Sequence, residues 1–131
     1  MPILQRRPLI VGLLALSIST ALPALGQEAQ PAAPGARVVS FEGEASLAEL
    51  AAKGPTVLFF YAAWCPDCRA TVGELKSHWS DVRSDLTLVI ADYDKEKDLK
   101  ARFGVTYQDT FVLLDSRGDA VRSWNGGGVQ A

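Results

Sequence analysis

The chain has 131 residues, of which 48% are hydrophobic and 21% charged, so it accommodates one domain and is too apolar for an intrinsically disordered protein. Thirteen basic and fifteen acidic residues give a net charge of −2, and this balance disfavours a nucleic-acid-binding role. The chain contains two cysteines, Cys65 and Cys68, and one histidine, His78. This excludes a scaffold with several disulfides, and a zinc site with four cysteine or histidine ligands from this chain.

Residues 1–26 have the pattern of a secretory signal peptide. Arg6 and Arg7 supply positive charge, Leu9–Ile18 is the apolar centre, and Gly26 ends a run of small residues after which cleavage is expected. The alternative is an uncleaved membrane anchor, although the apolar run Leu9–Leu25 is at the short limit for spanning a bilayer. In both cases we expect the domain to lie outside the cytoplasm, as a periplasmic or secreted protein or one anchored through its signal.

The rest of the chain is expected to form a linker at 27–36 and one domain at 37–131, because the linker is rich in proline and alanine and has no apolar periodicity. Uninterrupted apolar runs at 56–61 and 86–91 are typical of buried central strands. The order of elements predicts an α/β domain with a mixed sheet. The predicted elements are a strand at 38–41, a helix at 46–52, a strand at 56–61, a helix at 65–83, a strand at 86–91, a helix at 95–103, and strands at 111–114 and 120–124.

The two cysteines lie in the motif Trp64-Cys65-Pro66-Asp67-Cys68, directly after a predicted buried strand and at the start of a helix. A helix N terminus favours a thiolate on Cys65, and Pro66 fits there because the first helical N–H has no partner. Cys68 follows three residues later on the same face, so the two sulfurs can bond. We expect Cys65, as the more exposed sulfur, to be the nucleophile of thiol–disulfide exchange and Cys68 to be the resolving thiol.

Two other interpretations of the cysteines remain open. A purely structural disulfide would close a loop of four residues and would remove little chain entropy. A metal-binding module or metallochaperone would hold a soft ion on the two thiolates. His78 lies roughly 15 Å further along the predicted helix and cannot join them without a break in that helix. Our first interpretation therefore includes no metal site, and we expect no bound cofactor.

The stretch Val57–Cys68, and Phe103-Gly104-Val105 followed by Thr110-Phe111-Val112, resemble the thioredoxin superfamily. The resemblance covers residues 38–126 and implies a thioredoxin-like fold, with a central mixed β-sheet flanked by helices. It also implies dithiol oxidoreductase activity on protein thiols and disulfides. With its export signal, the chain is similar to exported bacterial thioredoxin-like proteins, and we expect a membrane electron donor to re-reduce it.

The sequence departs from the family pattern at three places. Phe59 stands where the family has a buried aspartate that aids proton transfer at the resolving thiol, so another carboxylate, another group or water must take that role. Asp109 stands where the family has a cis-proline that also keeps metals off the cysteines. A cis bond without proline costs about 3–4 kcal/mol, so we expect a trans bond. The helix that ends the family fold is missing before the last residue, Ala131, and we expect one sheet face to be partly uncovered.

Asp67 also bears on the direction of electron flow, because its carboxylate lies between the cysteines and disfavours a thiolate on Cys65. This favours a reductant or isomerase over a strong oxidase. Residues expected to bind or modulate the substrate are Trp64, Pro66, Asp67, Asp109 and Thr110.

Overall fold

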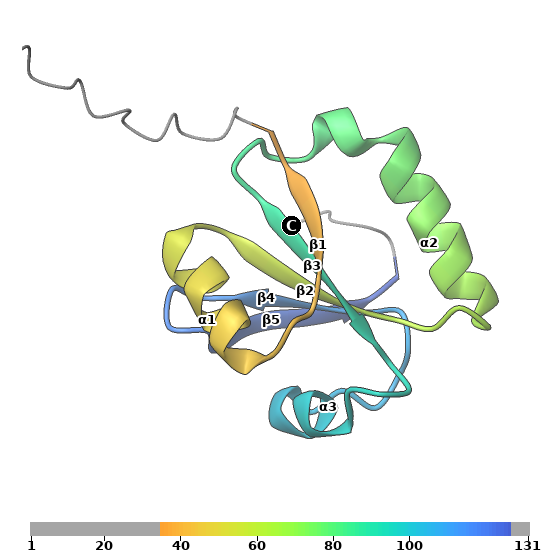
Figure 1. Cartoon of the computed structure of the whole chain (residues 1–131). Helices are drawn as coiled ribbons and strands as arrows, with labels where there is room; N and C mark the ends of the chain where they lie inside the picture. Colours follow the sequence, from red (N-terminus) through yellow and green to blue (C-terminus); the bar gives the residue numbers. More distant parts are fainter. Residues whose placement is uncertain (1–34, 127–131) are drawn as a thin grey trace, which may run out of the picture. The chain divides into compact units, whose positions relative to one another are not determined.

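A computed structural model describes residues 35–126 of the chain. The expected signal peptide at 1–26, the linker at 27–36 apart from its last two residues, and residues 127–131 lie outside the described part. Figure 1 shows the arrangement of the described elements. They are β1 (Arg37–Ser40), α1 (Glu44–Lys53), β2 (Thr56–Tyr61), α2 (Pro66–Ser77), the short 3-10 helix η1 (Trp79–Asp81), β3 (Thr87–Asp92), α3 (Lys97–Phe103), β4 (Thr110–Leu114) and β5 (Ala120–Asn125).

The predicted order of strands and helices is confirmed, and the main difference concerns the helix after the cysteine motif. It was expected to run to residue 83, but α2 ends at Ser77 and a 3-10 turn follows. In that turn the N–H of Asp81 donates to the carbonyl of His78 at 2.9 Å. The turn keeps Trp79 packed against the sheet, which is why the apolar periodicity continues beyond the end of the helix.

The five strands form one mixed sheet in the order β1-β3-β2-β4-β5. β1 and β2 pair with β3 in parallel, whereas β4 pairs antiparallel with both β2 and β5. This confirms the expected mixed sheet. β2 lies at its centre, so the cysteine motif, which follows β2, begins at the middle of one sheet edge.

Helices cover both faces of the sheet, with α1 and α3 on one face and α2 on the other (Figure 1). β2 supplies alternate side chains to both cores. Leu58 and Phe60 pack with residues of α1 and α3, whereas Val57 and Phe59 pack with Leu75 of α2. All four β2 side chains are buried, as the uninterrupted apolar run predicted.

Three aromatic rings cross the sheet on the α2 face. Phe59 of β2 stacks on Phe111 of β4, with ring centroids 4.3 Å apart and ring planes 7° apart. Phe111 in turn stacks on Trp124 of β5 at 5.4 Å. Such pairs stabilise a fold by about 0.5–1.5 kcal/mol beyond the burial of their area. The position at which the family carries an acid is therefore part of an aromatic core in this chain.

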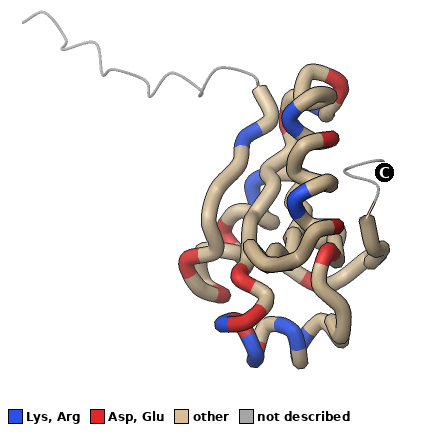
Figure 2. Tube along the Cα trace, turned by 90° about the vertical axis from the view of Figure 1, so that its right-hand side faces the viewer, with Lys and Arg blue, Asp and Glu red and all other residues tan. Residues whose placement is uncertain are grey.

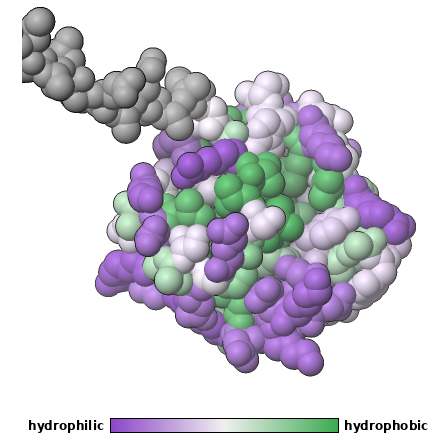
Figure 3. All heavy atoms as spheres, in the orientation of Figure 1, coloured by the Kyte–Doolittle hydropathy of each residue, from purple (hydrophilic) through white to green (hydrophobic). Residues whose placement is uncertain are grey.

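The α2 face is only partly covered in the described part of the chain, where no helix follows β5. An apolar cavity of about 540 Å³ lies beside α2, and Figure 3 shows hydrophobic residues at the surface between β1 and α2. The lining of the cavity is Val38, Tyr61, Val72, Leu75, Lys76, Trp79, Leu88 and Ile90.

Acidic and basic residues are interspersed along the described chain (Figure 2). None of the described helices is both long and apolar enough to cross a membrane.

The aromatic stack predicts a large loss of stability for Phe59→Ala. The substitution removes a fully buried ring and leaves a cavity between α2 and the sheet, which should lower the free energy of unfolding by about 3–5 kcal/mol. Chemical denaturation followed by fluorescence measures the change. Val121→Ala, at an exposed position on β5, is the control and should change stability by less than about 0.5 kcal/mol. Similar losses for the two variants would contradict a stabilising role for the stack.

Candidate active site

The loop after β2 places Cys65 at the N-cap of α2. The N–H of Cys65 donates to the carbonyl of Ala62 at 3.1 Å, which closes a tight turn before the helix. Pro66 is the first helical residue, as the motif predicted. Cys65 has extended backbone angles, and its Sγ accepts a hydrogen bond from the N–H of Cys68 at 3.2 Å. A sulfur in this position receives the unpaired donors of the helix N terminus.

Both cysteines are free thiols and both are buried. The exposed fraction is 1% for Cys65 and 0% for Cys68, so the expected greater exposure of Cys65 amounts to very little and both residues are almost fully buried. The two residues form a small cluster with Ala62, against which Tyr61 and Tyr93 pack. These neighbours cover the two cysteines. Because neither thiol is exposed, a difference in reactivity between them must come from their local surroundings.

The surroundings hold the Cys68 thiol strongly in its neutral form. Burial, the hydrogen bond and charge of Cys65 and the charge of Asp109 together raise the pKa of Cys68 to about 11, against a lowering effect from the backbone of Ala62. At pH 7 only about one Cys68 side chain in ten thousand is a thiolate. Cys68 therefore needs to lose a proton before it can attack a disulfide.

Trp64 lies on the surface beside the cysteines. Its ring is 57% exposed, and its Nε1 donates to Oδ2 of Asp94 at 2.8 Å. Asp94 belongs to the turn after β3, which Asp92 stabilises by accepting the N–H groups of Asp94 and Lys95. The indole is thus fixed in place, while its exposed surface remains available to a partner. The sequence singled out Trp64, but the partner Asp94 lies 30 residues away and no local pattern indicates it.

Asp109 precedes β4 and has φ of 58°, the one positive φ among the non-glycine residues described. No cis peptide bond occurs in the described part of the chain, in agreement with the expected trans bond. The N–H of Asp109 donates to the carbonyl of Phe60 at 3.0 Å, and its carbonyl accepts the N–H of Gly126 at 2.9 Å. Proline, with φ near −65° and no N–H, does not fit this conformation. Aspartate is among the few residues that enter the left-handed region readily.

The side chain of Asp109 points toward the first turns of α2. It is only 7% exposed, and its Oδ2 accepts a hydrogen bond from Oγ1 of Thr71 at 3.0 Å. Burial raises the pKa of Asp109, the bond from Thr71 lowers it, and the charge of Asp67 raises it. Sequence reasoning missed Thr71, although it lies three residues after Cys68 on the same helix face. The structure thus brings together the Cys68 side of α2, a hydroxyl and a buried carboxylate.

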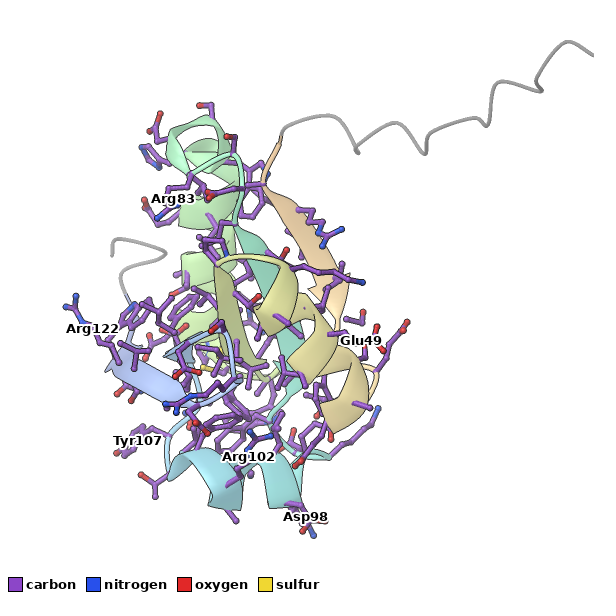
Figure 4. The ribbon with its side chains drawn as sticks, turned by 90° about the vertical axis from the view of Figure 1, so that its left-hand side faces the viewer. Glu49, Arg83, Asp98, Arg102, Tyr107 and Arg122 are labelled. Carbon is purple, nitrogen blue, oxygen red and sulfur yellow. The ribbon has the colours of Figure 1, made fainter. Side chains whose placement is uncertain are left out.

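Thr110 holds the loop before β4 against β5. Its Oγ1 donates to the carbonyl of Tyr107 at 2.6 Å and accepts a hydrogen bond from Nδ2 of Asn125 at 2.7 Å. Tyr107 itself projects away from the protein (Figure 4). A cavity of about 400 Å³ lies between this loop and the start of α2. Its lining consists of Asp67, Tyr107, Gln108, Asp109, Asn125 and Gly126.

The described residues offer no set of ligands for the metal-binding alternative. Within residues 35–126 no group of three or more histidine, cysteine, aspartate or glutamate side chains is arranged to hold an ion. His78 is the C-cap of α2, at the opposite end of the helix from the cysteines, and it lies beside Glu74. The arrangement around the cysteines is suited to reversible disulfide chemistry between two neighbouring thiols.

The contrast between the two thiols predicts selective alkylation of the reduced protein. With iodoacetamide at pH 8, Cys65 should carry the first label and Cys68 should react about 100-fold more slowly, because its thiol stays protonated. Peptide mapping by mass spectrometry measures both rates. The denatured protein is the control and should label both cysteines equally. A first label on Cys68 would contradict the assignment.

Comparison with known proteins agrees with this geometry, since the model of the thioredoxin family matches residues 37–130. Thioredoxin Asp f 28 of Aspergillus fumigatus is 32% identical over 80 residues, covering 59% of this chain and 70% of that protein. Sporulation thiol-disulfide oxidoreductase A of Bacillus subtilis (strain 168) is 27% identical over 131 residues, covering 93% and 78%. The crystal structure of Trxlp from Edwardsiella tarda EIB202 has a TM-score of 0.60 at 27% identity, covering 70% of this chain and 88% of that one. This chain therefore belongs to the thioredoxin family and is a protein thiol–disulfide oxidoreductase.

Proposed function

We propose that this protein acts outside the cytoplasm as a reductant or isomerase of protein disulfides, with Cys65 as the nucleophile and Cys68 as the resolving thiol. The observation that carries the proposal is the charge around the pair. Asp67 lies in the first turn of α2, and the buried carboxylate of Asp109 raises the pKa of Cys68. Both of these charges are negative, and they disfavour thiolates.

The roles of the two cysteines follow from their positions in the helix. Cys65 Sγ accepts the Cys68 N–H at the helix N terminus, which stabilises negative charge on that sulfur. Cys68 lies inside the first turn, buried and with a raised pKa, which suits a thiol that reacts only after a mixed disulfide has formed. Attack by the Cys65 thiolate on a protein disulfide would give that intermediate, and Cys68 would then release the reduced substrate.

The direction of electron flow depends on which redox form the surroundings stabilise. A strong oxidase is strong because its reduced form is stabilised. Here two carboxylates oppose the thiolates, so the disulfide form is relatively favoured and the reduced protein is the better electron donor. We therefore assign a potential nearer to about −270 mV, as in thioredoxin, than to about −120 mV, as in a strong oxidase.

Export is supported by the N-terminal pattern of positive charge, apolar centre and small residues at 1–26. A reductant in an oxidising compartment accumulates as the disulfide unless a partner returns electrons to it. A membrane protein that carries electrons outward is the class of donor that fits. Trp64, fixed by Asp94 and exposed beside the cysteines, provides an aromatic contact for such a donor or for a substrate.

The potential of the Cys65–Cys68 pair tests the proposed direction. Equilibration with glutathione buffers should give a value below about −180 mV, the level of a disulfide isomerase. Asp67→Asn should raise the potential by roughly tens of millivolts, because removing the carboxylate favours the thiolate. Asp98→Asn removes an equivalent carboxylate from the first turn of α3 and is the matched control, with no shift expected. A potential above −180 mV would make the protein an oxidase, and a fall in Asp67→Asn would reverse the charge argument.

Expression of the full chain in a bacterium tests the proposed export. The protein should be recovered from the periplasm or the medium with Gln27 as its first residue, since cleavage is expected after Gly26. Mass spectrometry of the intact protein measures the N terminus. The variant that combines Arg6→Glu and Arg7→Glu should not be exported. If the unmodified chain is instead recovered from the cytoplasm at full length, the proposal is contradicted. Membrane-bound protein of full length would identify the signal as an anchor.

A further inference from the structure

We propose that Asp109 is the proton acceptor for the Cys68 thiol when the mixed disulfide is resolved; this rests on the proposed function, in which Cys65 is the nucleophile. The carboxylate is buried at the first turns of α2, and one of its oxygens accepts no hydrogen bond from the residues that the structure describes. The burial of Asp109 and its one oxygen without a partner are explained by this role, without a second role in substrate binding.

Thr71 places the carboxylate on the Cys68 side of the helix. Residues three apart in a helix lie on the same face, with Cβ atoms about 5–6 Å apart, so Thr71 and Cys68 are neighbours. Thr71 donates its hydroxyl hydrogen to Oδ2 of Asp109 at 3.0 Å. The second oxygen, Oδ1, is buried and has no hydrogen-bond partner in the described part of the chain. The charge of Asp109 also raises the pKa of the Cys68 thiol, in agreement with this placement.

The other groups around Cys68 do not offer a proton acceptor in the mixed disulfide. Phe59, on the α2 face of β2, presents an aromatic ring stacked on Phe111. The charges that act on Cys68 are those of Cys65 and Asp109. In the mixed disulfide the Cys65 sulfur is bonded to the substrate and carries neither a charge nor a proton. Of these two groups, only Asp109 can then accept the proton of Cys68.

Forming the mixed disulfide also brings the two groups closer in proton affinity. Burial raises the pKa of the Asp109 carboxyl, which makes it a stronger base. Two of the causes that raise the pKa of Cys68, the hydrogen bond and the charge of Cys65, are lost once Cys65 is bonded to substrate. The thiol therefore becomes more acidic at the stage at which it must react.

The step conserves atoms and electrons. Asp109 Oδ1 takes the proton from Cys68 Sγ, and the Cys68 thiolate attacks Sγ of Cys65. The Cys65–Cys68 bond forms, the bond between Cys65 and the substrate sulfur breaks, and the substrate leaves as a thiolate that takes a proton from water. The two cysteines are oxidised by two electrons and the substrate disulfide is reduced. Asp109 then releases its proton to solvent.

The local structure carries costs that are unusual for a residue with only a packing role. Asp109 has a positive φ, and one buried carboxylate oxygen lacks a partner, which normally costs about 1–3 kcal/mol. Gly126 leaves room for the carboxylate, since a Cβ at that position would lie 3.3 Å from Oδ2. Such costs concentrate at functional sites.

The groups that face Asp109 come from α2, from its own loop, from β2 and from the end of β5. α2 contributes Asp67 and Cys68, with Cys65 at its N-cap. The loop that carries Asp109 contributes Tyr107, which lines the same cavity. β2 contributes the Phe60 carbonyl, and Asn125 and Gly126 approach from the end of β5, but none of these three titrates. The acid limb of the reaction should therefore follow the carboxyl of Asp109.

A single turnover of the purified reduced protein with glutathione disulfide tests the inference. The first glutathione released reports attack by Cys65, and the second reports resolution by Cys68. In Asp109→Asn the second release should be about 100-fold slower at pH 7, and the Cys65–glutathione intermediate should accumulate in acid-quenched samples. Asparagine is a matched substitution, because it also enters the left-handed region.

The pH profile separates proton transfer from other roles of Asp109. In the wild-type protein the second release should be nearly constant between the pKa of Asp109 and that of Cys68. In Asp109→Asn it should instead rise about tenfold per pH unit until Cys68 ionises by itself. A purely electrostatic role predicts the opposite result, a faster second release, because removing the charge favours the Cys68 thiolate. A second release as fast as that of the wild type, or faster, would overturn the inference.

Two further variants complete the test. Asp98→Asn removes an exposed carboxylate from the first turn of α3 and should keep the wild-type profile. Thr71→Val removes the hydrogen bond that lowers the pKa of Asp109, so the acid limb should move to higher pH; this readout serves if Asp109→Asn does not fold. An unmoved acid limb in Thr71→Val would contradict the inference. The wild type should release the first glutathione while a Cys65–glutathione disulfide forms. If it does not, the proposed function fails, and the inference fails with it.

Discussion

The hydrogen bond between the Asp109 N–H and the Phe60 carbonyl, at 3.0 Å, joins the two halves of the active site. It continues the antiparallel pairing of β2 and β4 by one step beyond the Phe60–Thr110 pair. β2 leads into the cysteine loop, and the loop before β4 carries the buried carboxylate. Because this pairing fixes the distance between the two segments, the position of Asp109 over α2 depends on the sheet rather than on the loop alone.

Burial decides how the site behaves chemically. A thiol and a carboxyl removed from water both favour their neutral forms, and the pKa values of Cys68 and Asp109 are raised for that reason. The same surroundings that protonate Cys68 also make Asp109 a better base. Cys65 differs in its position, because its sulfur caps the helix N terminus and accepts a backbone N–H. One thiol is thus arranged for attack and the other for a reaction that waits for its proton to be removed.

Much of the fold could be predicted because its signals are local. The apolar runs of β2 and β3 and the placement of Pro66 at the first position of α2 follow from neighbouring residues, and they agree with the structure. The end of α2 was missed because Trp79 keeps the apolar periodicity through a 3-10 turn. The nearly complete burial of both Cys65 and Cys68 was not predicted, because the residues that pack against them include Tyr93, which follows a different strand.

The sequence by itself determined the order of the elements, the pair of thiols at a helix start, and the replacement of the family's acid and proline by Phe59 and Asp109. These are properties of spacing and residue type, which need no knowledge of distant contacts. Only the tertiary structure decided what Asp109 touches, since Thr71 is 38 residues away along the chain. A carboxylate that looks like the loss of a proline in the sequence is held, through strand pairing and burial, on the Cys68 side of α2, where we propose that it acts as a base.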